Sequence, residues 1–174
     1  MVTKPPARTH DDEDYLRLDL QLCFSLHAAS RAFNGVYRTL LKDLGLTYPQ
    51  YLVMLTLWEH GELPVKSIGA KLRLDSGTLS PLLKRLESAG FVERRRSPAD
   101  ERSVTIRLTD RGTALRERAR AVPHRIAEAV PLPPDDFRTL RTLLATLTEG
   151  LDAAQTPPVT DHDGDVDGAV CAGE

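Results

Sequence analysis

The sequence predicts a mainly α-helical chain with one small β-hairpin, and three patterns support this prediction. Four leucines between Ser76 and Gly90 recur at i, i+3, i+4 and i+7, which is the spacing of one apolar helix face. After Gly90 the spacing changes to two, because apolar and polar residues alternate from residue 103 to 108 as they do in a half-buried strand. Residues 97–100 (Ser-Pro-Ala-Asp) between the two strand segments are turn formers. We therefore expect a helix followed by a two-stranded hairpin.

The predicted helix begins after Asp75, a good N-cap residue, and ends at Gly90, a good C-cap residue. Pro81 lies about one turn inside the helix, where it removes little of the hydrogen-bond ladder. The face opposite the leucines carries hydrogen-bond donors and no large apolar group, which suits a helix that lies in a DNA groove. The candidates for groove and phosphate contacts are Ser76, Thr78, Ser80, Lys84 and Arg85.

Arginines flank the turn of the predicted hairpin, whose strands are residues 91–96 and 103–108. A helix followed by an arginine-flanked hairpin is the pattern of a winged helix. We expect Arg94, Arg95 and Arg96 to meet DNA phosphates, which adds affinity and salt dependence but no sequence discrimination.

The net charge of −2 conceals a segregation of charge along the chain. Six of the 25 acidic groups lie from Asp152 onward, where there is no Lys or Arg, which leaves 19 acidic groups against all 23 basic ones before it. Most of the basic excess lies between Lys66 and Arg125, and such a cluster suits a phosphate backbone as well as a solvated surface.

The segment before this helix has the spacing of a helix-turn-helix. A long helix is expected from Asp14 to Gly45, and a second one begins with the capping box Thr47–Gln50 and ends at Gly61. Residues 62–65 could form a short strand, and residues 65–72 could form a helix. A short turn at residues 73–74 would join this helix to the one between Asp75 and Gly90, which would then be the recognition helix.

Two amphipathic helices are expected to pair with a second protomer. Thr109 opens a helix that Pro123 should kink, and a last helix starts at residues 133–136 with an apolar stripe. The first and last helices have more apolar surface than one small domain needs. The predicted organisation is a disordered lead-in (residues 1–13), a winged-helix domain (14–151) and a disordered acidic tail (152–174). Within the domain, the DNA-binding lobe spans about 47–112 and the dimerisation helices about 14–44 and 113–151.

No apolar run is long enough to span a membrane, and the N-terminus has no apolar core of a signal peptide. Two cysteines, Cys23 and Cys171, make no disulfide framework, so we expect a cytoplasmic protein in a reducing compartment.

These motifs resemble the MarR family of dimeric winged-helix transcription factors. The resemblance rests on Leu46-Thr47 with Gln50-Tyr51, on Asp100-x-Arg102-Ser103-Val104, and on Leu108-Thr109-x-x-Gly112. Within that family the chain is similar to the organic hydroperoxide resistance regulators (OhrR), on residues 22–24, 46–51, 57–59 and 74–79. The resemblance implies double-stranded DNA with a pseudo-palindromic operator as the partner, and a wing-tip Arg102, steadied by Asp100, that enters the minor groove.

The same resemblance implies that Cys23 senses organic hydroperoxides, with Tyr37 and Tyr48 of the other subunit as its hydrogen-bond donors. A thiolate attacks a peroxide, so the sulfur needs donors or positive charge that lower its pKa. Tyr37 lies on the helix face of Cys23, but fourteen residues place it about 21 Å away along that helix. It can therefore reach Cys23 only from an antiparallel partner helix. Oxidised Cys23 could then condense with a low-molecular-weight thiol or a backbone nitrogen.

Other interpretations remain open on the sequence alone. The chain could respond to a small aromatic ligand, could be a thiol peroxidase using Cys23, or could bind DNA as a non-specific architectural protein. Cys23 and His27 supply two metal ligands at i, i+4, two short of a structural zinc set, so we expect no metal and no cofactor. Cys23 itself could be merely a buried small apolar residue.

Overall fold

The computed structural model of the protein describes residues 16–96 and 104–155. The chain divides between Val130 and Pro131 into an N-terminal and a C-terminal unit. The predicted lead-in, Asp100 and Arg102 at the wing tip, and residues 156–174 of the predicted tail lie outside the described residues.

The first helix, α1, spans Leu22–Leu40, so the prediction that it begins at Asp14 is wrong. Leu18–Leu20 form a 3-10 turn (η2), and Gln21 has extended backbone angles (φ −80°, ψ 117°), so no continuous helix connects this turn to α1. Leucines alternate with charged residues over 16–20, which is not helical spacing. After α1 a second 3-10 turn, η3 (Lys42–Leu44), ends at Gly45 with φ 68°, a left-handed conformation that favours glycine.

The helix-turn-helix forms as predicted. Helix α2 spans Tyr48–His60, and the backbone N–H of Thr47 donates to Gln50 Oε1 at 2.8 Å in the predicted capping box. Strand β1 (Leu63–Pro64) leads into α3 (Val65–Leu72), and α4, the recognition helix, spans Ser76–Ser88. The turn between α3 and α4 contains Arg73 in the left-handed conformation.

The wing is an antiparallel hairpin of β2 (Val92–Arg96) and β3 (Val104–Leu108). Strand β1 pairs with the other edge of β3, so the sheet order is β1-β3-β2. Val92 lies opposite Leu108, and Arg94 lies opposite the fully buried Ile106.

The helix after the wing is broken near Pro123, as predicted, and the structure fixes the position of the break. Helix α5 spans Asp110–Ala119 and α6 spans Ala121–Ala129. A proline ring clashes with the carbonyl of the residue four positions earlier, which here is Ala119, the last residue of α5.

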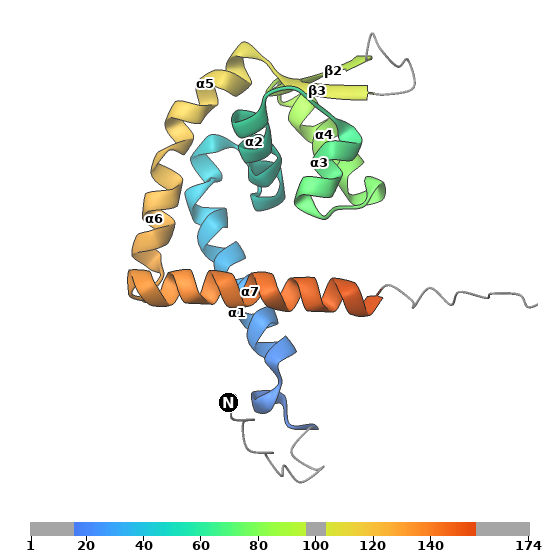
Figure 1. Ribbon diagram of the computed structural model, residues 1–174. Coiled ribbons are helices and arrows are strands. Elements are labelled where there is room, and N and C mark those ends of the chain that lie inside the picture. The colour runs from blue at the N-terminus through green and yellow to red at the C-terminus, as the bar shows by residue number, and fades with distance from the viewer. Residues whose placement is uncertain (1–15, 97–103, 156–174) are drawn as a thin grey trace, which may run out of the picture. The chain divides into compact units, whose positions relative to one another are not determined.

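The core of the N-terminal unit lies among α2, α3, α4, the sheet and α5, which Figure 1 shows gathered around one another. Its largest fully buried side chains are Leu41, Tyr51, Val53, Met54, Leu57, Ile68, Leu79, Leu83, Leu86 and Ile106. The leucines of α4 thus face the core, as their spacing predicts, and the polar residues of α4 are left on the outside.

Helix α7 spans Pro134–Gln155 in the C-terminal unit, so it continues four residues past the start predicted for the acidic tail. None of its described side chains is buried, and its apolar stripe includes Leu143 with 61% of its surface exposed. In the described parts of the chain no helix is long and apolar enough to cross a membrane.

Candidate functional site

The outer face of α4 presents the predicted DNA-contacting residues to solvent. Ser76, Thr78, Ser80, Lys84 and Arg85 are all exposed, whereas Leu79, Leu83 and Leu86 on the opposite side are at most 1% exposed. A polar face of this kind on the second helix of a helix-turn-helix can lie in the major groove.

One of these residues has a second role that the sequence did not reveal. Thr78 donates through its backbone N–H to Asp75 Oδ1 at 2.9 Å and through its hydroxyl to Asp75 Oδ2 at 2.8 Å. These hydrogen bonds to Thr78 hold the pKa of the Asp75 carboxyl below its ordinary value. The Thr78 hydroxyl proton therefore serves the helix cap, which leaves the oxygen as an acceptor.

The wing arginines do not form one cluster, because successive strand residues point to opposite faces of a sheet. Arg94 lies on the face of Val92, towards α4, where its Nε is 3.2 Å from Glu87 Oε2. Arg95 lies on the other face, 2.7 Å from Glu93 Oε1, and Arg107 pairs with the same Glu93 oxygen. These pairs are partly exposed, so DNA phosphates can compete for the arginines. The Arg96 side chain, like Asp100 and Arg102, lies outside the described residues.

Tyr37 and Tyr48 lie together within one chain. Their rings stack at a centroid distance of 4.3 Å, and the ring centroid of Tyr51 lies 6.0 Å from that of Tyr37. Burial raises the pKa of the Tyr37 hydroxyl, with a further contribution from Tyr48, and burial also raises the pKa of Tyr48. The same causes raise the pKa of Tyr51 to about 12. All three phenols therefore stay protonated at neutral pH and can donate hydrogen bonds.

Cys23 lies in the first turn of α1 and is exposed, so within its own chain it is not the buried small apolar residue of the alternative interpretation. It lies about 21 Å from Tyr37 along the helix axis, so the fold does not bring Cys23 to the tyrosines of its own chain. Within residues 16–96 and 104–155, no group of three or more His, Cys, Asp or Glu residues could hold a metal ion.

Two further aromatic residues of α2 extend the tyrosine cluster towards the wing. Tyr51 is 2% exposed, and its ring lies edge-on to that of Trp58 with the ring centroids 6.2 Å apart. Trp58 Nε1 donates a hydrogen bond to the carbonyl oxygen of Gly112 at 2.9 Å. Tyr48, Tyr51 and Trp58 share α2 at spacings of three and seven residues. That spacing was visible in the sequence, but the partner across 54 residues was not.

Comparisons with known proteins agree with this architecture. The profile of a family described as "Transcriptional regulator SarA/Rot" matches residues 35–118. The organic hydroperoxide resistance transcriptional regulator of Bacillus subtilis is 48% identical over 138 residues, which is 79% of this chain and 94% of that protein. The regulator TtmR of Methylorubrum extorquens is 49% identical over 141 residues, 81% of this chain and 72% of that protein.

Among solved structures, reduced AbfR bound to DNA superposes with a TM-score of 0.71 at 40% identity, over 82% of this chain and 97% of that one. AbfR comes from Staphylococcus epidermidis and has also been solved with a disulfide formed. The relatives from Bacillus subtilis and Methylorubrum extorquens are transcriptional regulators, and their identity with this chain extends over most of it. The helix-turn-helix and the wing of this chain agree with that assignment. The chain belongs to the MarR family of winged-helix, DNA-binding transcriptional regulators.

Proposed function

We propose that the protein is a homodimeric repressor that leaves its operator when an organic hydroperoxide oxidises Cys23. The observation that carries the proposal is the stacked pair Tyr37–Tyr48, which is partly buried and whose phenols stay protonated. A chain with this pair and an exposed cysteine on α1 has the donors and the nucleophile that a peroxide sensor needs. Its similarity to the hydroperoxide resistance regulator of Bacillus subtilis supports the same signal.

The chemistry requires a thiolate at Cys23. The thiolate attacks one oxygen of the hydroperoxide, the O–O bond breaks, and the alkoxide leaves and takes up a proton as an alcohol. Cys23 then carries a sulfenic acid. A low-molecular-weight thiol can condense with this group, forming a mixed disulfide and releasing water.

The tyrosines reach the sulfur from the other subunit in this proposal. An antiparallel arrangement of two α1 helices brings the start of one helix to the end of the other and so spans the distance of about 21 Å. Apolar side chains of α1 that are at least 36% exposed support such a pairing: Leu22, Phe24, Phe33 and Val36. The stripe of α7 provides a second apolar surface for the partner.

Oxidation changes what the tyrosines can donate to. A thiolate accepts strong hydrogen bonds from two phenols, whereas a sulfenic acid or a mixed disulfide is larger and carries no full charge. The displaced tyrosines belong to the ring cluster that ends at Trp58, which is bonded to Gly112 just after the wing. A shift of this cluster alters the separation of the two recognition helices, which must match half-sites about one helical turn apart.

On the DNA side, the polar face of α4 is proposed to enter the major groove, with Ser76, Thr78, Ser80, Lys84 and Arg85 as the contacts. Arg94 to Arg96 are proposed to meet phosphates, and Arg102, with Asp100, to enter the minor groove. Two such lobes in a symmetric dimer would read a pseudo-palindromic operator.

A gel-shift titration of DNA from the intergenic region beside the gene tests the proposal, with and without cumene hydroperoxide. We expect the reduced protein to bind and the treated protein to release the DNA, and a thiol reductant to restore binding. Cys23→Ser should bind DNA and stay bound after treatment, and Cys171→Ser should respond as the unmodified protein does. Release of Cys23→Ser by the peroxide would overturn the redox mechanism.

Two measurements separate the rival functions. A small aromatic acid that releases the DNA while cumene hydroperoxide does not would indicate a ligand-responsive regulator. Steady consumption of hydroperoxide with a thiol reductant, over many turnovers, would indicate a thiol peroxidase.

A further inference from the structure

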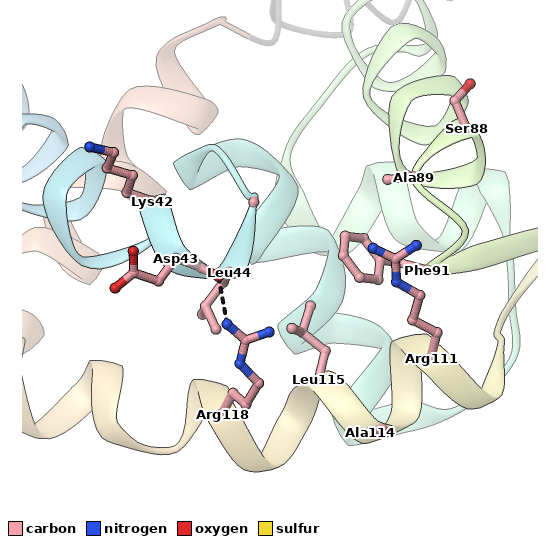
Figure 2. Close-up of a pocket in the computed structure, with 11 residues that line it drawn as sticks. Lys42, Asp43, Leu44, Ser88, Ala89, Phe91, Arg111, Ala114, Leu115 and Arg118 are labelled. Carbon is pink, nitrogen blue, oxygen red and sulfur yellow. Dashed lines mark hydrogen bonds between the residues drawn. The ribbon is translucent and has the colours of Figure 1, made fainter.

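A cavity of about 540 Å³ lies between η3, the end of α4 and α5, apart from the tyrosine cluster. Its volume falls within the range of small-molecule sites in proteins. The apolar part of its lining includes Leu44, Phe91 and Leu115, each at most 6% exposed. Figure 2 shows these side chains together with the charged ones around them.

The charged residues around this cavity are mainly basic. Lys42, Arg111 and Arg118 contribute three positive charges, and Asp43 contributes the one negative charge of the lining. Arg111 and Arg118 stand seven residues apart on α5, about 10 Å along the helix. Figure 2 shows both side chains rising from α5 towards the same space, with Leu115 between them.

Both guanidinium groups are held in place by neutral partners. The guanidinium carbon of Arg111 lies 4.9 Å from the centre of the Phe91 ring, and Arg118 donates to the backbone carbonyl oxygen of Asp43 at 2.6 Å. Among the described residues, neither Arg111 nor Arg118 forms an ion pair with a carboxylate. A guanidinium stacked on a ring keeps its N–H edge free for a carboxylate or a phosphate.

We propose that this cavity binds a small polyanion, a molecule with two or more carboxylate or phosphate groups. One anionic group meets Arg111, another meets Arg118, and Lys42 supplies a third charge at the rim. Two fixed guanidinium groups about 10 Å apart along the helix favour a ligand with separated charges over a monoanion. The apolar wall between them suits the carbon skeleton of an organic polyanion.

A DNA phosphate is the less suitable occupant. The cavity is lined by Ser88 and Ala89 at the C-terminal end of α4, whereas the predicted base-contacting residues begin at Ser76, about 18 Å away along the helix. The bound anion would instead join η3, which follows α1, to the start of α5 at the base of the wing. Cys23 does not line the cavity, so this proposal can be tested independently of the peroxide mechanism.

Isothermal titration calorimetry on the reduced full chain tests this site, with citrate, pyrophosphate and acetate as probes at constant ionic strength. We expect saturable binding of one citrate or one pyrophosphate per chain, and none of acetate. Whichever of the two binds more tightly identifies the site as one for carboxylates or for phosphates. The Cys23→Ser protein should bind equally well.

Arg111→Gln should weaken binding about tenfold or more, the loss expected when a charged hydrogen bond is removed. Lys42→Gln, which removes a charge of the lining from an exposed residue, should also weaken binding. Arg125→Gln is the matched control, because Arg125 is exposed on α6 and does not line the cavity.

Absence of saturable binding, or equal loss of binding in Arg125→Gln, would overturn the proposal. So would a lowered salt dependence of operator binding in Arg111→Gln, which would assign Arg111 to DNA.

Discussion

The indole Nε1 of Trp58 donates a hydrogen bond of 2.9 Å to the carbonyl oxygen of Gly112, across 54 residues of sequence. This bond ties the end of α2 to the first turn of α5, directly after the wing. Tyr51 contacts the same indole ring. The aromatic cluster of α1 and α2 and the base of the wing are therefore parts of one packed unit.

Replacing Trp58 by Phe should lower the free energy of unfolding by about 1–3 kcal/mol, because the Gly112 carbonyl loses its side-chain donor. Urea unfolding followed by far-ultraviolet circular dichroism measures this change. Fluorescence is unsuitable because Trp58 is the sole tryptophan of the chain. An unchanged unfolding midpoint would mean that the bond contributes nothing to the fold.

Two glycines should respond in opposite ways to alanine. A Cβ at Gly112 would lie 2.0 Å from the Phe91 carbonyl oxygen, whereas a Cβ at Gly35, inside α1, would meet nothing within 4 Å. Gly112→Ala should therefore cost about 4 kcal/mol or more, or prevent folding, because both clashing atoms belong to the backbone. Gly35→Ala should stabilise by about 0.5–1 kcal/mol through helix propensity. Urea unfolding of both variants checks the pair, and similar midpoints would contradict the contact at Gly112.

Local signals in the sequence predicted most of the N-terminal unit. The caps at Thr47, Asp75 and Thr109 all form, because each depends on residues within three positions of one another. Pro123 likewise marks its break, since its clash is with a residue four positions earlier. The start of α1 was wrong because no glycine, proline or capping residue marks the interruption at Gln21.

The candidate site was less predictable, because its geometry depends on distant partners. Strand alternation separates Arg94 from Arg95, and Glu87 on α4 takes up Arg94. Nothing in a linear run of arginines indicates that pairing. The hydrogen bond from Trp58 to Gly112 and the stacking of Arg111 on Phe91 also join residues that are remote in sequence and lie on different elements. The contact of Cys23 with its donors remains a prediction, since it requires a second chain.

The Asp75 cap should make stability depend on pH in a defined direction. Its pKa in the folded protein lies below the ordinary value of 3.8, because Thr78 hydrogen bonds favour the charged form. The stabilisation is therefore fully present above pH 3.8 and is lost as the pH falls below it, through the lower folded-state pKa.

Asp75→Asn isolates this contribution, because asparagine also caps helices but does not titrate there. The unmodified protein should be more stable than the variant at neutral pH, and the difference in urea midpoint should shrink as the pH falls below 3.8. A difference that grows on acidification would show that the sign is wrong.

Arg85 on the exposed face of α4 should contribute to the salt dependence of operator binding. If it meets one phosphate, Arg85→Gln should reduce the slope of log K against log salt by about 1. Fluorescence anisotropy over a series of salt concentrations measures this slope. Arg125→Gln, which removes a charge from α6, is the matched control and should leave the slope unchanged.

Removing the Tyr37 hydroxyl should slow the alkylation of Cys23 in the dimer. The proposed hydrogen bond from that phenol stabilises the thiolate, which is the reactive form, so its loss should lower the rate. The Phe ring of Tyr37→Phe keeps the stacking on Tyr48, which holds the packing constant. The rate of alkylation of Cys23 by iodoacetamide at neutral pH, measured in Cys171→Ser protein, should fall.

Tyr48→Phe should lower this rate as well, whereas Tyr51→Phe should leave it unchanged, because the Tyr51 side chain is buried in its own chain. These decreases in rate should vanish when the protein is diluted to the monomer, since the donors come from the partner subunit. Equal rates for the unmodified protein and Tyr37→Phe in the dimer would show that the phenol does not act on the sulfur. A decrease that persists in the monomer would place the donor in the same chain, against the distance of about 21 Å along α1.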